Sequence, residues 1–97
     1  ITVDELKKLK EMKQDLILLD VRQPDETDQG IIPGAILIPL NELEENIKQF
    51  NKEDHIVVYC RSGRRSKSAQ EKFSANNFIN VSNLLGGILE WDKSKED

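Results

Sequence analysis

The chain contains a single cysteine among its 97 residues, and this scarcity excludes several classes of protein. One cysteine forms no internal disulfide and cannot build a multi-cysteine zinc site, so neither a disulfide scaffold nor a zinc ribbon fits. No apolar run approaches the ~20 residues that a membrane-spanning helix needs, and no stretch has the pattern of a signal peptide. We therefore expect a cytoplasmic protein, kept in reducing conditions, that does not enter a membrane.

Positive charge is also scarce overall. Fourteen Lys and Arg stand against 18 Asp and Glu, which gives a formal net charge of −4. This balance argues against a general affinity for nucleic acid or for anionic membranes. The hydrophobic share is 37% and the charged share 33%, which indicates a small core with a well-solvated surface. We expect residues 1–97 to form a single domain.

Short apolar segments alternate with helical patterns along the whole chain. The apolar segments have the length of strands, and the first three are the strongest: 16–19, 35–38, 56–59 and 78–81. Helical patterns are visible at 3–12, with a capping box of Thr2 and Glu5; at 40–50, with Asn41 and Glu44 as cap; at 66–77; and at 88–91. Continuously apolar strands suit a sheet that is covered on both faces. The pattern predicts an α/β fold, a small three-layer domain with a four- to five-stranded, mainly parallel sheet flanked by helices.

Two residues with reactive or charged side chains come directly after predicted strands. Cys60 follows segment 56–59, and Asp20 follows segment 16–19. The carboxyl ends of parallel strands share one edge of the sheet, and ligands of open α/β sheets bind there. We therefore expect Cys60 and Asp20 to project toward the same edge.

The stretch CRSGRRS, residues 60–66, connects a strand to a helix that we expect to begin near Ser66. A tight turn of this kind directs main-chain N–H groups into its own concavity, and Gly63 permits the backbone angles that the turn needs. The N-terminus of the helix adds unpaired N–H donors and a positive dipole. The thiol of Cys60 should therefore ionise below the pKa of ~8.5 of a free cysteine.

Four cations lie within seven residues of this cysteine: Arg61, Arg64, Arg65 and Lys67. In an acidic chain this is a local reversal of sign, and the helix dipole disfavours cations at a helix N-terminus. A lone cysteine after a buried strand is often only a small apolar core residue. The combination of thiol, glycine turn and cations instead indicates a thiolate at the bottom of an anion-binding loop.

Four stretches, in this order and spacing, resemble the rhodanese-like sulfurtransferases over nearly the whole chain. They are LLDVRQPDE (18–26), GIIPGAILIPL (30–40), CRSGRRS (60–66), which is similar to the active-site loop of that family, and LLGGILEW (84–91). The family's fold, a small α/β domain with a parallel sheet, agrees with the pattern above. The chain departs from the family at Ile31, where a histidine is common. This position is not the nucleophile, so the departure affects local hydrogen bonding only.

The resemblance implies a thiosulfate sulfurtransferase in which Cys60 carries sulfur as a persulfide. The main-chain N–H groups of residues 61–65 would stabilise that anion, and the substrate would be bound by Arg61, Ser62, Gly63, Arg64 and Arg65. The partners implied are a small sulfur donor, a thiol or cyanide acceptor and a possible protein of a sulfur relay. No metal and no cofactor is implied.

The remaining polar residues are given supporting or structural roles. We expect Asp20 and Arg22 to brace the loop through hydrogen bonds, with Ser66 also in support. Glu26 is left open between a pair with Arg22 and a solvated charge. His55 precedes a strand as a surface turn residue, and Trp91, which follows the Gly86-Gly87 pair, is expected to cap the core.

Two other functions compete with this interpretation. A phosphatase or arsenate reductase would place five residues between cysteine and arginine, whereas four separate Cys60 from Arg65 and the fifth position beyond the loop is Ser66. The shorter ring favours a single sulfur atom over a phosphate. The second alternative is a sulfur carrier or docking module that serves a partner protein, and the sequence leaves it open.

Overall fold

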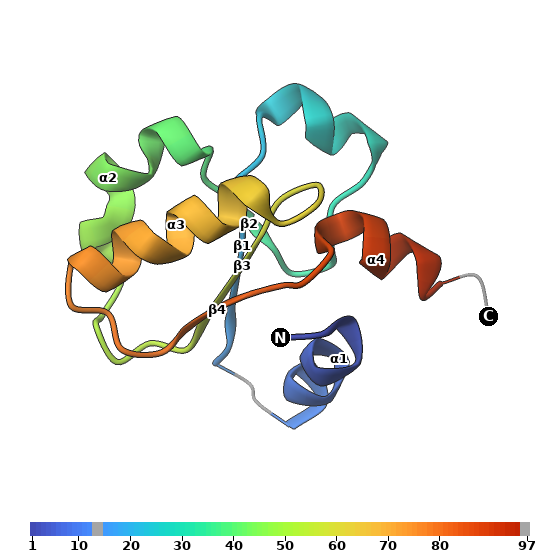
Figure 1. Ribbon diagram of the computed structural model, residues 1–97, viewed down its shortest axis with the longest axis horizontal. Coiled ribbons are helices and arrows are strands. Elements are labelled where there is room, and N and C mark those ends of the chain that lie inside the picture. Colours follow the sequence, from blue (N-terminus) through green and yellow to red (C-terminus); the bar gives the residue numbers. More distant parts are fainter. Residues whose placement is uncertain (13–14, 96–97) are drawn as a thin grey trace.

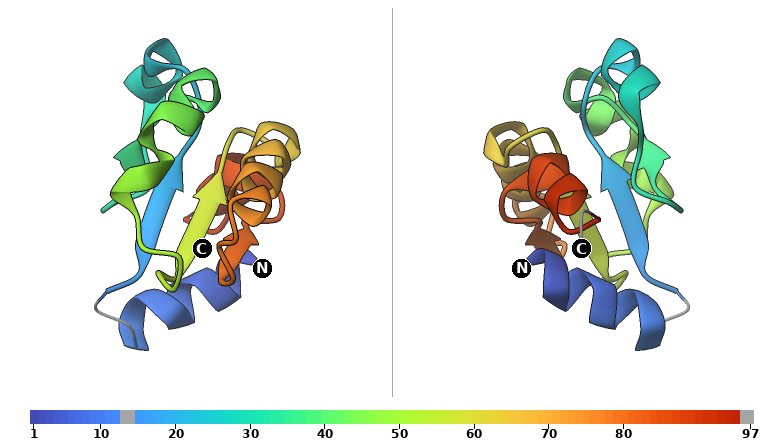
Figure 2. Two further views of the ribbon diagram at one scale, coloured as in Figure 1. Left: turned by 90° about the vertical axis from the view of Figure 1, so that its left-hand side faces the viewer. Right: turned by 90° about the vertical axis from the view of Figure 1, so that its right-hand side faces the viewer.

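The computed structural model describes residues 1–12 and 15–95, and at its centre lies a four-stranded parallel sheet. The strand order is β2-β1-β3-β4. Their bounds are β1 (Ile17–Asp20), β2 (Ile36–Leu37), β3 (Ile56–Tyr59) and β4 (Val81–Asn83). Figure 2 shows the β1 and β3 arrows side by side and pointing the same way. The α/β prediction and the parallel sheet are confirmed.

Helices cover both faces of this sheet, as the continuously apolar strands required (Figure 1). α1 (Val3–Met12) and α4 (Gly87–Lys93) lie on one face, and α2 (Leu43–Asn46) and α3 (Arg64–Ala75) lie on the other. Successive residues of β3 alternate between the two cores: Ile56 and Val58 face α3, whereas Val57 and Tyr59 face α4. All four β3 residues are fully buried, and burial of this apolar surface is the main stabilising contribution to the fold.

The first helix begins as the sequence predicts. The main-chain N–H of Glu5 donates to Thr2 Oγ1 at 3.1 Å, and the N–H of Thr2 donates to Glu5 Oε1 at 3.0 Å, which completes the capping box. Its last residue, Met12, is largely exposed. Among the described residues, no helix combines the length and the apolar character needed to cross a membrane.

The segment 40–50 is more irregular than the single helix predicted for it. It consists of the 3₁₀ turn η2 (Leu40–Glu42), the short α2 and a second 3₁₀ turn, η3 (Ile47–Gln49). The predicted cap at Asn41 is wrong, because Asn41 Oδ1 accepts a hydrogen bond from Gln23 Nε2 at 3.1 Å instead. The side chain of Asn46 also bonds the main-chain oxygen of Glu42, a local alternative to regular helix.

The fourth strand lies three residues later than predicted, because residues 76–78 terminate α3. Asn77 adopts a left-handed conformation with φ of 68°. The N–H of Phe78 bonds the oxygen of Phe73, and the N–H of Asn77 bonds the oxygen of Ser74. This is a Schellman motif, and its hydrophobic contact is the Phe73–Phe78 ring pair at 4.9 Å. Phe78 therefore belongs to the end of the helix, and the strand begins at Val81.

Candidate active site

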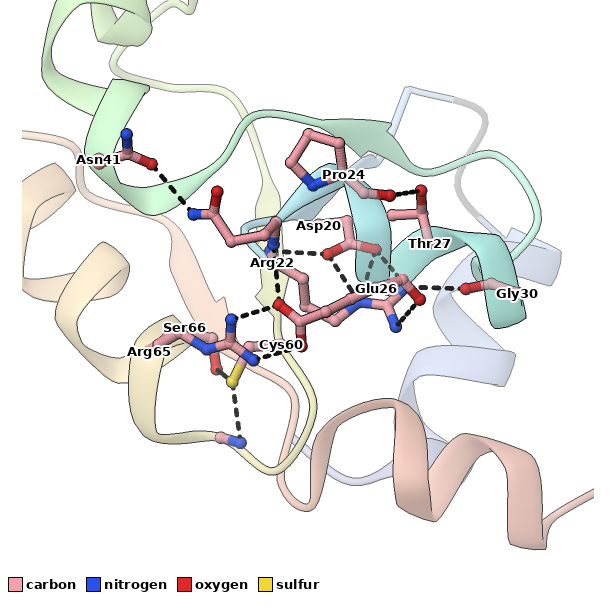
Figure 3. A network of polar contacts seen from close by, with 12 residues as sticks. Asp20, Arg22, Pro24, Glu26, Thr27, Gly30, Asn41, Cys60, Arg65 and Ser66 are labelled. Carbon is pink, nitrogen blue, oxygen red and sulfur yellow. Dashed lines mark hydrogen bonds and ion pairs between the residues drawn. The ribbon is translucent and has the colours of Figure 1, made fainter.

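Cys60 lies directly after β3, at the carboxyl edge of the sheet, with its side chain aimed at the start of α3 (Figure 3). The helix begins at Arg64, two residues before the predicted start. Gly63 is its N-cap and has φ of +116°, a conformation that residues with a Cβ rarely adopt. This glycine allows the chain to turn from the strand into the helix within three residues.

The sulfur of Cys60 is surrounded by hydrogen-bond donors. The N–H of Gly63 points at Sγ from 3.1 Å, and Ser66 Oγ lies 3.5 Å from it. Burial raises the pKa of the Cys60 thiol, since the residue is only 1% exposed. The Ser66 hydroxyl and the N–H groups of Ser66, Gly63 and Ser62 oppose that effect and outweigh it, so the pKa lies below its ordinary value. The direction agrees with the expectation from the sequence.

The N-terminus of α4 holds the carbonyl side of the loop. The N–H of Ile88 donates to the oxygen of Cys60 at 3.0 Å, and that of Leu89 donates to the oxygen of Arg61 at 3.2 Å. A Cβ on Gly87 would lie 2.5 Å from both of these oxygens, so only glycine permits the approach. With its carbonyls directed at α4, the loop is free to turn N–H groups toward Sγ. Gly87 therefore shapes the site, a role that the sequence pattern alone did not assign.

Arg65 is anchored by a carboxylate from a distant part of the chain. Its Nη1 and Nη2 bond Glu26 Oε1 and Oε2 at 2.6 and 2.8 Å, and Glu26 lies in the 3₁₀ helix η1 (Pro24–Gln29). The hydrogen bond to Arg65 is the main reason that the pKa of Glu26 falls to about 2. Neither outcome that the sequence left open for Glu26, a carboxylate pair with Arg22 or a solvated charge, is correct.

Asp20 and Arg22 form a buried ion pair at the end of β1. Asp20 is fully buried and accepts three side-chain contacts from Arg22 at 2.7–3.1 Å. Arg22 also donates to the main-chain oxygens of Gly30 at 2.8 Å and Glu26 at 3.4 Å. The pair therefore ties both ends of the 26–30 segment to the sheet, and through Glu26 it positions Arg65 (Figure 3).

The other residues of the loop face solvent. Arg61, Ser62 and Arg64 are exposed. Arg61 also borders a pocket of about 250 Å³ beside the loop, which is lined by Arg22, Glu26, Gln29, Gly30, Arg61, Ile88, Leu89 and Asp92. This arrangement places two solvent-facing cations next to an otherwise buried sulfur.

Sequence reasoning also missed Asn83, which touches the site from the end of β4. Its side chain bonds Ser66 Oγ at 2.5 Å and the main-chain oxygen of Gly63 at 3.2 Å. The sequence offered no signal for it, because the weak fourth strand was placed three residues too early.

Three residues outside the loop were also assigned from the sequence. Trp91 is buried in the core between α1 and α4, as predicted. His55 is half-buried directly before β3, and its main-chain oxygen accepts the N–H of Ile17 at 2.9 Å. Ile31 is 38% exposed, so no packing is disturbed at this departure from the family pattern.

A parallel α/β sheet whose strand β3 leads through a buried, hydrogen-bonded cysteine into the start of α3 defines a class of fold, the α/β domains with a thiol in a strand–loop–helix turn. The chain belongs to the rhodanese family, because residues 2–94 match the family model described as Rhodanese-like domain.

Individual relatives support this assignment. A mitochondrial protein of Schizosaccharomyces pombe, named as a candidate thiosulfate sulfurtransferase, is 41% identical, with 81% of this chain and 66% of that protein covered. YrkF of Bacillus subtilis, named as a candidate sulfur carrier protein, is 33% identical, with 99% and 52% covered. The chain thus spans about half to two thirds of the length of these relatives. The structure of the human single-domain sulfurtransferase TSTD1 matches with a TM-score of 0.90 at 28% identity and covers 100% of this chain and 96% of its own.

Proposed function

We propose that this chain is a sulfurtransferase that moves a sulfane sulfur from a donor such as thiosulfate to a thiol or cyanide acceptor. The observation that carries the proposal is the convergence of donors on one sulfur atom: the N–H of Gly63 at 3.1 Å and the hydroxyl of Ser66 at 3.5 Å from Cys60 Sγ. Such a site favours a thiolate and, one bond further out, the anionic sulfur of a persulfide. The names of the relatives above support the same chemistry.

In the first step the Cys60 thiolate attacks the outer sulfur of thiosulfate. A new S–S bond forms at Cys60 Sγ, the S–S bond of the donor breaks, and sulfite leaves with the bonding electron pair. In the second step an acceptor thiolate or cyanide attacks the outer sulfur of the persulfide, and the electron pair returns to Cys60 Sγ. The two displacements are covalent catalysis of the double-displacement type, and neither changes the number of protons.

The cations of the loop have different tasks in this proposal. Arg61 and Arg64 are exposed and attract the dianionic donor through the long-range field. Arg65 is held by Glu26 and contributes a fixed positive charge near Cys60. The hydrogen bond to Glu26 is the main reason that the pKa of Arg65 is raised, and the charge on Cys60 adds to it. Ser62 and Gly63 contribute through their main-chain N–H groups.

Intact mass spectrometry after incubation with thiosulfate tests the proposal. The wild-type chain should gain the mass of one sulfur atom, and cyanide should remove it. Cys60→Ser should gain nothing and should lose all sulfur transfer, while its urea unfolding midpoint stays close to that of the wild type. Sulfur transfer by a folded Cys60→Ser variant would exclude Cys60 as the carrier.

A second candidate function is that of a sulfur carrier that serves a partner protein. It is favoured by the similarity to YrkF and by the exposed cations Arg61, Arg64 and Lys67 around the thiol, which suit an acidic partner surface. The same persulfide would be used, so the discriminating measurement is turnover. Many turnovers with free thiosulfate and cyanide support the enzyme, and transfer from the loaded persulfide only to a protein acceptor supports the carrier.

A further inference from the structure

The side chain of Asn83 reaches the site from β4, and its orientation is fixed by its neighbours. Asn83 Nδ2 faces the main-chain oxygen of Gly63 at 3.2 Å. A carbonyl oxygen carries no proton, so only the amino group of the amide can face it favourably. The oxygen Oδ1 must then face Ser66, and it does so at 2.5 Å.

This orientation decides where the hydroxyl proton of Ser66 points. Asn83 Oδ1 has no proton to give, so the short contact requires Ser66 Oγ to donate to it. The same hydroxyl lies 3.5 Å from Cys60 Sγ, and it has only one proton. Ser66 can therefore donate to Asn83 or to the Cys60 sulfur, but not to both at once.

We propose that Asn83 is a positioning residue that competes with Cys60 for the hydroxyl proton of Ser66. While Cys60 is a thiol or carries sulfur, its Sγ bears no full charge and Ser66 donates to Asn83. When Sγ is a thiolate, Ser66 turns to donate to the sulfur, and the bond to Asn83 is given up. Asn83 thus limits how strongly the Cys60 thiolate is stabilised, and Ser66 donates to Asn83 again once the charge has moved to the outer sulfur of the persulfide. This last clause rests on the proposed function, whereas the competition itself does not.

The competition involves only Ser66 Oγ, Asn83 Oδ1 and Cys60 Sγ. Its effect on the Cys60 thiolate can therefore be separated from the electrostatic effect of the surrounding charged groups. The ion-paired groups of the site are Arg65 on α3, which interacts with Cys60, its partner Glu26 on η1 and the Asp20–Arg22 pair at the end of β1. Arg61 and Arg64 of the loop face solvent. Beside Asn83 itself, the N-terminal ammonium of Ile1 donates to its main-chain oxygen at 2.7 Å, and Lys67 lines the same surface pocket. None of these groups changes in the variants below, so their effects cancel in the comparison.

The experiment follows thiolate absorbance against pH in four proteins: wild type, Asn83→Leu, Ser66→Ala and the double variant. Leu is close to Asn in size and cannot hydrogen-bond, and Asn83→Ala serves as a second test if Leu disturbs the fold. Asn83→Leu should move the appearance of the thiolate to lower pH, because Ser66 is then free to donate to Sγ. Ser66→Ala should move it to higher pH, and the double variant should match Ser66→Ala alone.

Iodoacetamide supplies an independent readout of the same equilibrium. At a pH below the Cys60 pKa, alkylation of Asn83→Leu should be about three- to tenfold faster than that of the wild type. One hydrogen bond to a charged sulfur raises the thiolate fraction about ten- to a hundredfold, and the lower nucleophilicity of the more acidic thiolate offsets part of that gain. Gln70→Ala is the matched control, since Gln70 Nε2 also ties α3 to β4, through the oxygen of Val81 at 2.9 Å. It should leave the titration unchanged.

Two outcomes would overturn the inference. One is a shift of the Asn83→Leu thiolate to higher pH, which would mean that Asn83 supports the loop rather than competing with it. The other is an equal Asn83→Leu shift with and without the Ser66 hydroxyl, which would mean that the effect does not pass through Ser66. Neither the thiolate titration nor the alkylation requires sulfur transfer, so both can be interpreted even if the proposed function is wrong.

Discussion

Arg65 and Glu26 stand 39 residues apart in the sequence and meet in a two-pronged ion pair beside Cys60. Both guanidinium Nη atoms hold one carboxylate oxygen each, at 2.6 and 2.8 Å. The pair joins η1, which is tied to β1 by Arg22, to the first turn of α3, which carries the donors to the sulfur. Among the described side-chain ion pairs, it is the one that joins η1 to α3 across the site.

Glu26→Gln should destabilise the protein by about 1 kcal/mol at pH 7, because both side chains are partly exposed and solvent screens the pair. In the wild type the N–H of Gln23 donates to Glu26 Oε1, and a Gln side chain at position 26 keeps an oxygen that can accept this bond. The ion pair with Arg65 is therefore the main interaction that the variant loses. The folded-state pKa of Glu26 is depressed to about 2 from 4.5, so its contribution is complete above about pH 4.5 and is lost as pH falls toward 2.

Urea unfolding of wild type and variant at several pH values measures this dependence. The difference between the two free energies of unfolding should shrink steadily below pH 4.5. Glu44→Gln, which removes the more exposed pair with Lys72, is the control and should cost less at every pH. A difference that stays constant down to pH 3 would contradict the assignment of the shifted carboxyl.

Gly87→Ala should reduce stability by about 2–5 kcal/mol and also reduce sulfur transfer. The residue has φ of +59°, and its new Cβ would lie 2.5 Å from the oxygens of Cys60 and Arg61. Left-handed strain accounts for roughly 1–2 kcal/mol and the steric overlap for about 1–3 kcal/mol. Moving α4 away would release the two carbonyls that its N–H groups hold.

Gly34→Ala is the matched control for this substitution. Gly34 also has a positive φ, +87°, but nothing lies within 4 Å of the Cβ that alanine would add. It should lose only the strain component in urea unfolding and should keep its sulfur transfer. Equal losses in both variants would show that the approach of α4 to the loop has no special importance.

The outcome at particular residues shows what local sequence could predict. The capping box at Thr2, the apolar strand before Cys60 and the glycine turn after it depend on near neighbours, and all three are present. The Glu26–Arg65 pair and the Asn83–Ser66 contact depend on how distant elements meet, and no local pattern encodes that meeting. The fourth strand was misplaced because Phe78 is apolar for a different reason, its packing against Phe73 at the end of the helix.

Arg61→Gln and Arg64→Gln should raise the KM for thiosulfate several-fold and leave kcat nearly unchanged. Both side chains are exposed, so their contribution is attraction of the dianion rather than contact in the transition state. Steady-state kinetics at low and high ionic strength measures it, because salt should weaken the effect. Lys52→Gln removes an equal charge from the turn before β3, at the far end of that strand from Cys60, and should change little. A KM in the arginine variants that is independent of salt would contradict electrostatic attraction.

Insertion of one glycine between Gly63 and Arg64 tests whether loop size selects sulfur over phosphate. The ring from Cys60 to Arg65 would then have the spacing of a phosphatase, with five residues between cysteine and arginine. The N–H of Gly63 and the hydroxyl of Ser66 meet at one sulfur only because α3 begins directly after Gly63. An extra residue shifts Ser66 relative to Cys60, so sulfur transfer should be lost. The wild type should hydrolyse no aryl phosphate and reduce no arsenate under conditions in which it turns over thiosulfate.

The matched control is a glycine inserted between Lys52 and Glu53, in the exposed turn before β3, which should leave activity intact. Coupled assays for thiocyanate, aryl phosphate hydrolysis and arsenate reduction on the same preparations supply the comparison. Wild-type sulfur transfer by the lengthened loop would mean that ring size does not set the chemistry. The preference for sulfur would then have to come from the charge of the loop, and the variants of Arg61 and Arg64 would become the decisive measurement.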